Sequence, residues 1–175
     1  MKIHTSLSVV IRISLWVILI IGGAIYSVMK DWGTPFFVNI LFHLFTGTMG
    51  IIVLVLGFRA AANGGRELTK GRVGDIPRLE TNRLVTSGIF GCMRHPMLFG
   101  LTLLPLAWAL LLGSPTFITL VAPVEMLFIV GMVLIFEEME VKRKFGKVYE
   151  TYKEKVPMVT FHSKCLKMLF RKYKG

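Results

Sequence analysis

Acidic residues are scarce in this chain of 175 residues: 10 Asp and Glu stand against 21 Lys and Arg, which gives a formal charge of +11. Charged residues make up only 18% of the chain, whereas 54% are hydrophobic and the mean hydropathy is +0.65. A disordered basic tail or a nucleic-acid-binding arm would be poor in apolar residues, and a soluble basic domain would not reach this hydropathy. The composition therefore predicts one membrane domain, residues 1–175, with no nucleic acid among its partners.

Cysteine and histidine are also rare. Cys92 and Cys165 are too few for a disulfide framework and lack a CxxC spacing, so we predict that both are reduced. The histidines lie far apart and form neither an HExxH motif nor a paired His/Cys motif; they are His4, His43, His95 and His162. We therefore expect no metal site.

Long apolar runs, by contrast, are abundant. A helix needs about 20 apolar residues, within a range of about 17–25, to cross a bilayer. The segments that approach this length are 7–29, 35–58, 97–113 and 115–136. Only Gly113 and Ser114 separate the last two, so these two are predicted to form an antiparallel helical hairpin. The expected fold is an all-α, polytopic membrane helical bundle with about four transmembrane helices and a C-terminal helical hairpin.

Three residues inside these spans are unusual for a membrane helix. Pro105 and Pro123 are predicted to kink their helices, which neighbouring helices in a membrane can tolerate. Glu125 should face the bundle or a hydrated cavity, because a carboxylate is costly in lipid. A structural hydrogen bond and a contact with substrate both remain open for Glu125.

The basic residues are concentrated in two segments. Residues 59–95 and 137–175 hold 18 of the 21 Lys and Arg, whereas the two connections at the other end of the spans hold only Lys30 and Asp31. Lys and Arg favour cytoplasmic loops, so both termini are predicted to be cytoplasmic. Segment 59–95 is predicted to be a cytoplasmic loop with short helical pieces, because Gly and Pro interrupt it repeatedly.

The segment from Glu137 is predicted to form an amphipathic helix that Pro157 ends. Its apolar stripe consists of Val141, Phe145, Val148, Tyr149, Tyr152 and Val156. Counting back four residues from Val141 places Glu137 on the buried stripe, whereas Glu138 and Glu140 fall four residues before Lys142 and Lys144, as in ordinary surface pairs. Glu137 is then either a ligand-binding group or a structural carboxylate that donors satisfy.

The tail from Met158 mixes apolar and basic residues. This mixture is typical of a short helix in the membrane interface, with its basic side chains at phosphate headgroups. A solvated, irregular end is the alternative.

An ordered set of short motifs runs from residue 82 to residue 157. It comprises Leu84 to Phe90 (LVTSGIF), Arg94 to Gly100 (RHPMLFG), the pair Glu137 and Glu138, and Phe145-Gly146 followed by Tyr149, Tyr152, Val156 and Pro157. This set resembles the membrane-embedded methyltransferases of the isoprenylcysteine carboxyl methyltransferase family, which share the signature with phospholipid N-methyltransferases. The resemblance covers nearly half of the chain.

The resemblance implies an S-adenosylmethionine (SAM) cofactor in a cytoplasmic pocket, with its methyl group directed toward a lipid-accessible tunnel. The cofactor contacts that it implies are Leu84, Val85, Phe90, His95, Pro96, Met97, Leu98 and Glu137. The expected reaction is methyl transfer to a lipophilic acceptor, and Glu138 is the candidate base if that acceptor is an amine. Arg94 is expected either to serve this site or to bind a headgroup phosphate.

Two departures from the family pattern concern the acceptor. Phe90 and Leu98 replace the Tyr of many relatives, and Val133 stands where isoprenylcysteine enzymes place an Arg for the substrate carboxylate. A prenylcysteine carboxylate would lack that Arg as a partner, so the acceptor could instead be a phospholipid or other lipid amine, a thiol or another lipophilic nucleophile. Two rival functions are a non-catalytic scaffold or transporter subunit and a different membrane enzyme that uses His95 as acid or base. The sequence leaves the oligomeric state open.

Overall fold

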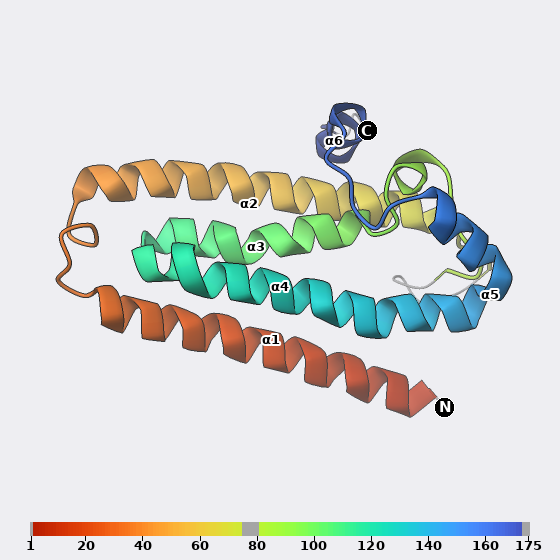
Figure 1. The fold of residues 1–175 in the computed structure, drawn as a ribbon, viewed down its shortest axis with the longest axis horizontal. Helices are drawn as coiled ribbons and strands as arrows, with labels where there is room; N and C mark the ends of the chain where they lie inside the picture. The colour runs from red at the N-terminus through yellow and green to blue at the C-terminus, as the bar shows by residue number, and fades with distance from the viewer. Residues whose placement is uncertain (1, 75–80, 173–175) are drawn as a thin grey trace. The chain divides into compact units, whose positions relative to one another are not determined.

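The computed structural model describes residues 2–74 and 81–172, with side chains from residue 14 onward. Part of the predicted loop, with Asp75, Pro77, Arg78 and Glu80, lies outside the described residues, as do Lys174 and the side chains of Lys2, His4 and Arg12. Every regular element in the described ranges is helical (Figure 1). The elements are α1 (Lys2–Asp31), α2 (Ile40–Thr69), the 3₁₀ turn η1 (Gly88–Gly91), α3 (Pro96–Leu112), the π-helical turn η2 (Phe117–Val121), α4 (Ala122–Met132), the π-helical turn η3 (Val133–Glu137), α5 (Glu138–Lys155) and α6 (Ser163–Phe170).

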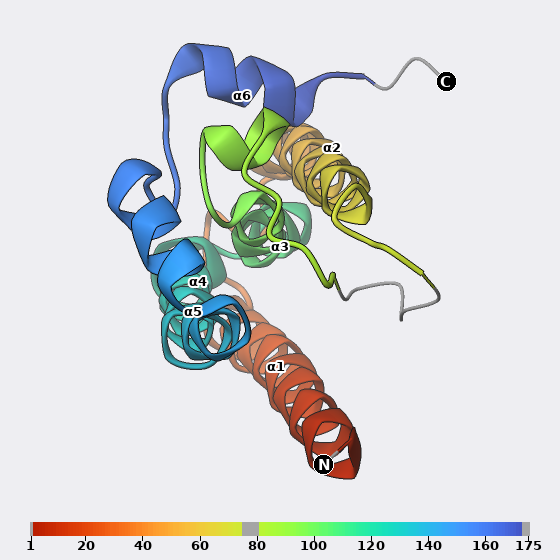
Figure 2. The same ribbon diagram turned by 90° about the vertical axis from the view of Figure 1, so that its right-hand side faces the viewer.

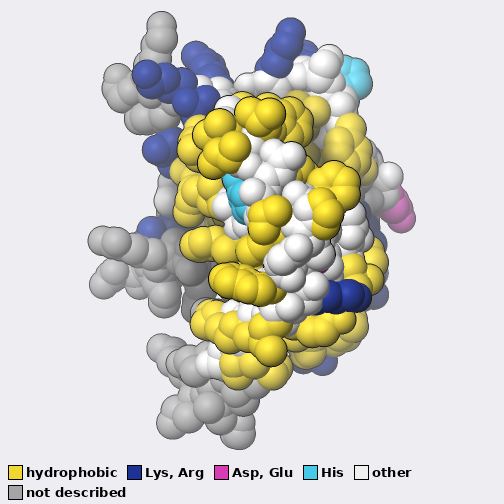
Figure 3. Space-filling model, turned by 90° about the vertical axis from the view of Figure 1, so that its left-hand side faces the viewer, with side chains coloured by type: hydrophobic (Ala, Val, Ile, Leu, Met, Phe, Trp, Pro, Cys, Tyr) yellow, Lys and Arg dark blue, Asp and Glu magenta, His cyan; other side chains and the backbone are white. Residues whose placement is uncertain are grey.

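Three stretches of helix in the described residues each contain a segment long and apolar enough to cross a membrane: Ser14–Asp31, Ile40–Thr69 and Phe117–Lys155. The apolar helix α3 has 17 residues, at the lower end of the length that a span needs. Hydrophobic side chains cover most of the face shown in Figure 3. The prediction of an all-α membrane helical bundle is confirmed.

The chain forms two compact units, each made of segments far apart in the sequence. The first consists of Met1–Ile52 and Pro105–Leu127. Its core contains Ala109, Phe117 and Ala122, which are fully buried. The chain reverses at Gly113 (φ 61°) and Ser114, immediately after α3.

Asp31, at the end of α1, supports this turn. Its carboxylate accepts hydrogen bonds from the hydroxyls of Ser114 and Thr116 and from the backbone N–H of Thr116 at 2.9 Å. Those groups open the helix that leads into α4, where an anionic acceptor is favourable. Asp31 is only 5% exposed. The sequence places it in an outer turn without indicating this capping role.

Glu125 is buried in the same unit, as predicted, with 3% of its surface exposed. A Cβ added to Gly23 of α1 would lie 3.0 Å from its Oε1 atom, so a glycine leaves room for this carboxylate. Neither carboxylate oxygen has a hydrogen-bond partner among the described residues. The hydrogen bond considered for Glu125 is thus not present here.

The π-helical turn η2 ends just before Pro123, where a kink is predicted. Proline cannot donate a backbone hydrogen bond, and its ring crowds the preceding turn of an α-helix. A π-helical turn widens the helix at that point and accommodates the interruption. Pro105 is fully buried inside α3.

The second unit consists of Val53–Leu104 and Phe128–Gly175. Here α2 continues beyond Phe58 to Thr69, although a loop is predicted from residue 59. Gly64, one of the glycines that suggest a loop, is a packing residue instead. A Cβ on Gly64 would approach the Cγ of Met97 to 2.8 Å, and a Cβ on Gly100 would approach the carbonyl oxygen of Gly57 to 2.5 Å. Small residues at such positions let α2 and α3 pack closely.

A disulfide joins Cys92, just after η1, to Cys165 in α6. The prediction that both cysteines are reduced is therefore wrong. The residues are 73 apart in the sequence, and only the tertiary structure brings their Cα atoms to 5.8 Å. This spacing is typical of disulfides.

The short helix α6 lies beside η1, as Figure 2 shows. Leu169 is fully buried against Ala60, Ile89 and Met93. The side chain of Asn63 donates hydrogen bonds to the carbonyl oxygens of Leu169 and Arg171, at 2.7 and 2.9 Å. The tail is thus a helix whose apolar face packs on the protein, and the alternative of an irregular end is excluded for this segment.

Candidate functional site

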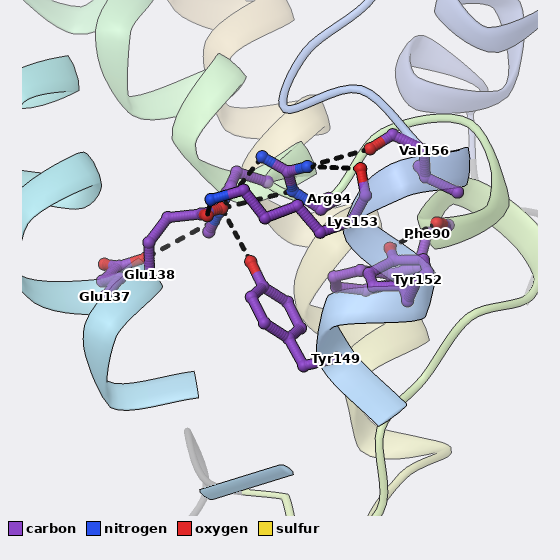
Figure 4. Close-up of polar contacts among 9 residues, drawn as sticks. Phe90, Arg94, Glu137, Glu138, Tyr149, Tyr152, Lys153 and Val156 are labelled. Carbon is purple, nitrogen blue, oxygen red and sulfur yellow. Dashed lines mark hydrogen bonds and ion pairs between the residues drawn. The ribbon is translucent and has the colours of Figure 1, made fainter. Parts of the chain in front are cut away.

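The second unit contains a buried carboxylate, Glu138, at the first position of α5 (Figure 4). Its side chain is 6% exposed and is surrounded by donors from two parts of the chain. Oε1 accepts hydrogen bonds from Tyr149 Oη at 2.7 Å, Arg94 Nε at 3.2 Å and His95 Nε2 at 2.7 Å, and Oε2 accepts one from Lys153 Nζ at 2.7 Å. Glu138 therefore links the segment before α3 to both halves of α5.

Arg94 is the most extensively bound of these partners. Its side chain is 8% exposed, and Nη2 lies 3.1 Å from Oε1 of Glu138. Nη1 donates to the carbonyl oxygens of Lys153 and Val156, at 3.1 and 3.0 Å. Of the two roles expected for Arg94, the structure favours a role within this site over binding of a headgroup phosphate.

The backbone also joins these segments. The N–H groups of Arg94 and His95 donate to the carbonyl oxygens of Pro157 and Met158, at 2.9 and 3.1 Å. Two adjacent residues before α3 are thereby fixed against the chain that follows α5. The position of His95 is set by its backbone as well as by its ring.

Burial by itself would raise the pKa of the Glu138 carboxyl. The hydrogen bonds from Lys153, Tyr149 and His95, together with the charge of Arg94, outweigh it and lower the pKa to about 2. Burial raises the pKa of Tyr149 far above its ordinary value, and its hydrogen bond to the Glu138 carboxylate adds to this. The site thus holds an ionised carboxylate and a protonated phenol at neutral pH.

Glu137, the residue before Glu138, is far more exposed. Its side chain is 53% exposed, and Oε2 is 3.6 Å from Nδ1 of His95. The prediction that Glu137 occupies the buried stripe and Glu138 the surface is wrong: Glu138 is buried. Lys142, the expected partner of Glu138, pairs with Glu150 at 2.8 Å instead.

Two irregularities explain this reversal. The π-helical turn η3 ends at Glu137, so the four-residue step does not hold before α5. Gly146, with φ 54° and ψ −132°, breaks α5 in the middle. The apolar positions after Gly146 therefore belong to another helical face than those before it, and Val148 is 66% exposed.

The other predicted contact residues line the neighbouring part of this unit. Val85, Phe90, Pro96 and Leu98 are buried, whereas Leu84 and Met97 are half-buried. Val85 packs over Gly71, where a Cβ would approach its Cγ2 to 2.5 Å. The structure brings His95, Glu137 and Glu138 into direct contact, and it places the apolar residues in the protein interior around η1 and the start of α3.

Three side chains of the site are not predicted from the sequence. Tyr149 and Lys153 bind Glu138, and the hydroxyl of Tyr152 donates to the carbonyl oxygen of Phe90 at 2.6 Å. The spacing of Tyr149 and Lys153, four residues apart after a glycine, could indicate a shared helical face. It gives no sign of Glu138 as the common partner.

Together, the apolar helices and the charged cluster of the second unit define a helical membrane protein with a buried polar site at the start of α5. Comparison with known proteins identifies its relatives. The sequence profile of the phospholipid methyltransferase family matches residues 45–148, so the chain belongs to that family. The match includes every predicted contact residue and ends before Tyr149.

One curated relative is the Protein-S-isoprenylcysteine O-methyltransferase B of Arabidopsis thaliana. It is 29% identical over 126 residues, which cover 70% of this chain and 62% of the relative. This chain thus spans less than two thirds of that protein's length. No solved structure matches the chain.

Proposed function

We propose that this membrane protein transfers a methyl group from SAM to a lipophilic acceptor. The observation that carries the proposal is the contact between His95 and Glu137, at the start of α3 and the end of η3. This pair lies inside the segment that matches a methyltransferase family. A methyltransferase requires a methyl donor. SAM is the proposed donor because its chemical groups match these residues.

The exposed carboxylate of Glu137 is the feature that fits SAM. The cofactor carries an ammonium group and ribose hydroxyls that need an acceptor, and Glu137 leaves most of its carboxylate accessible, at 53% exposure. Glu138 cannot serve in this way because donors already occupy both of its oxygens. In this proposal Leu84, Val85, Phe90, Pro96, Met97 and Leu98 form the apolar wall beside the adenine.

When bound, SAM would supply a methyl group already activated on a sulfonium, so the protein has mainly to position the reactants and exclude water. Glu138 contributes by pairing with Arg94 and Lys153 and offsetting part of their positive charge, because unpaired cations would repel the sulfonium. The environment of Glu138 argues against the predicted role of base, since a carboxyl with a pKa of about 2 is a weak proton acceptor. Glu138 is therefore proposed as a positioning residue that holds His95.

The acceptor is proposed to be a lipophilic molecule that enters from the bilayer. A prenylcysteine carboxylate would find no Arg partner at position 133, because that residue is the buried Val133. A phospholipid or other lipid amine is the second candidate, and it is favoured by the family that the profile identifies. An amine would need to lose its proton before or during transfer.

The proposed topology places both termini, the charged site and α6 on the cytoplasmic side. Its support is the distribution of Lys and Arg between the ends of the spans. Reporter fusions at residue 35 and at the C-terminus test this arrangement. They should report opposite sides of the membrane, and the same side for both would contradict the topology.

Methyl transfer is tested with tritium-labelled SAM, membranes that contain the protein and extraction of the lipids. The parent should label a lipid fraction, and Glu137→Ala should reduce labelling by at least about 10-fold, as for the loss of a charged contact. Glu140→Ala, which removes an exposed carboxylate from the same helix, is the matched control and should retain activity. Equal labelling by Glu137→Ala and the parent would remove Glu137 from the site.

A binding measurement separates an enzyme from a scaffold or transporter subunit. S-adenosylhomocysteine at 100 times its Kd should raise the free energy of unfolding by about 2.7 kcal/mol. Glu137→Ala should lose this stabilisation at the same ligand concentration. A parent protein that is not stabilised at any concentration would support the non-catalytic alternative.

A further inference from the structure

The outer face of α6 carries a basic groove that the proposed methyl transfer does not use. The groove is open to solvent, is lined by Ser163, Lys164, Lys167, Met168 and Arg171, and has a volume of about 360 Å³. Lys164 and Lys167 lie three residues apart on one face of α6, and Arg171, the C-cap residue of the helix, lines the same groove. No carboxylate is among the lining residues.

These three cations have no hydrogen-bond or ion-pair partner of their own among the described side chains. Lys164, Lys167 and Arg171 are all exposed, whereas Leu169 and Cys165 of α6 face the rest of the unit. Like charges this close together repel one another unless an anion lies between them. The lining therefore fits an anionic group that accepts several hydrogen bonds, which is the chemistry of a phosphate.

The groove is held on a rigid base. The disulfide between Cys92 and Cys165, the buried Leu169 and the hydrogen bonds from Asn63 fix α6 to the rest of its unit. A flexible tail would lose backbone entropy when it gathers three long cations around one anion. The backbone of α6 is already ordered before binding, so most of that loss does not arise. The arrangement is therefore a preorganised site rather than a transient cluster.

The depth of α6 identifies the source of the phosphate. Its contacts on α2 are Ala60 and Asn63, which follow Phe58, the end of the second span predicted from the sequence, by less than two helical turns. At 1.5 Å per residue this distance is at most about 8 Å, comparable with the thickness of a headgroup layer. This short distance supports a position of the groove at the level of lipid headgroups.

An exposed aromatic residue beside the groove agrees with this depth. Phe161, immediately before α6, is 76% exposed and makes an edge contact with Phe99 of α3 at 5.7 Å between ring centroids. Large apolar side chains next to basic ones are typical of segments that lie in the membrane interface. A soluble phosphate site would not need this exposed ring.

We infer that the groove formed by Ser163, Lys164, Lys167 and Arg171 binds the phosphate of an anionic phospholipid headgroup. The bound lipid lies at the membrane boundary with its phosphate among the three cations and its acyl chains in the bilayer. This site involves none of the residues assigned to the methyl donor. The inference therefore does not rest on methyl transfer.

The test uses the purified full-length chain in dodecyl maltoside micelles, without SAM, and native mass spectrometry to measure bound dioleoylphosphatidylglycerol. Removal of each cation should weaken binding roughly 5-fold, and the triple variant Lys164→Gln, Lys167→Gln, Arg171→Gln roughly 100-fold. The matched control, Arg143→Gln, Lys147→Gln, Lys155→Gln, removes the same charge from exposed positions on α5. It should bind the lipid as the parent does.

Two further arms distinguish the possible outcomes. Dioleoylphosphatidylcholine, whose headgroup is zwitterionic, should bind more weakly than phosphatidylglycerol, and inorganic phosphate at the same concentration should not displace the anionic lipid. Parent-like binding by the groove variant, or an equal loss in the α5 control, would overturn the site. Full displacement by inorganic phosphate would overturn the assignment to a lipid. If the triple variant does not fold, by circular dichroism, Lys167→Gln alone decides the question through its roughly 5-fold effect.

Discussion

Tyr149 donates its phenolic hydrogen to Oε1 of Glu138 at 2.7 Å, across the break that Gly146 makes in α5. The hydrogen bond joins the two halves of a kinked helix through a carboxylate that also binds Arg94 and His95. Glu138 is thus the point at which three separate backbone segments meet. Its ionisation, its main cationic partner and the kink each lead to a prediction.

Protonation of Glu138 should make the protein less stable in acid. Its pKa is about 2 in the folded protein and about 4.5 without these contacts, so the ionised form stabilises the fold at neutral pH. This contribution is fully present above about pH 4.5 and is lost as the pH falls toward 2, with an upper limit of about 3 kcal/mol. Thermal unfolding in detergent between pH 6 and pH 2 measures it.

Glu138→Gln is the control for this pH dependence. The variant should unfold at a lower temperature than the parent at neutral pH, because an amide cannot replace the carboxylate among these donors. Its unfolding temperature should fall less steeply between pH 4.5 and pH 2. Parallel curves for the two proteins would show that other groups dominate the acid transition.

Substitution of Arg94 by Lys should destabilise the protein although the charge is kept. Arg94 binds Glu138 and the carbonyl oxygens of Lys153 and Val156 together, and a single ammonium group cannot reproduce that geometry. We expect a loss of about 2–3 kcal/mol in the free energy of unfolding, measured by denaturation in mixed micelles. Arg143→Lys, at an exposed position on the same unit, should change it by less than about 0.5 kcal/mol.

Gly146→Ala should also be destabilising. Its φ of 54° and ψ of −132° lie in a region that a residue with a Cβ rarely adopts, although no atom would clash with that Cβ. The expected cost is about 1–3 kcal/mol, which thermal unfolding measures. Gly131→Ala, inside α4 with open space around its Cβ, is the matched control and should be neutral or slightly stabilising. A neutral Gly146→Ala would mean that the kink at Gly146 is not kept in solution.

Reduction of the Cys92–Cys165 disulfide should release α6. Neither cysteine should react with a maleimide in the folded, non-reduced protein, and both should react after reduction. The chain-entropy model assigns about 4 kcal/mol to a cross-link between residues 73 apart. The Cys92→Ser, Cys165→Ser variant should unfold at the same lowered temperature as the reduced parent, and a maleimide reaction without reduction would contradict the pairing.

The apolar spans were predictable because hydrophobic length is a property of local sequence. The runs that end at Asp31 and that begin near Ile40 needed no knowledge of neighbours. The end of α2 was not predictable in this way. Gly64 and Gly65 are interpreted as helix breakers in isolation, whereas the close approach of Met97 makes glycine the residue that fits at position 64.

The site was predicted in part. His95 and Glu137 were identified through a resemblance, and their contact at 3.6 Å agrees with a shared role that remains a proposal. The helical-face argument for Glu137 failed, because it assumed an unbroken α-helix from residue 137 to Val156. A π-helical turn and the break at Gly146 alter the register, and neither is a property of hydrophobic periodicity.

The sequence by itself determined that this chain is a helical membrane protein with basic segments at the ends of its spans, since hydrophobicity and charge act residue by residue. Only the tertiary structure decided which of the two adjacent glutamates is buried, which cysteines meet and which face of α6 is free. These outcomes depend on contacts between segments far apart in the chain, such as Arg94 with Glu138 and Cys92 with Cys165. Burial free energies and pKa values follow from those contacts, and a linear pattern does not contain them.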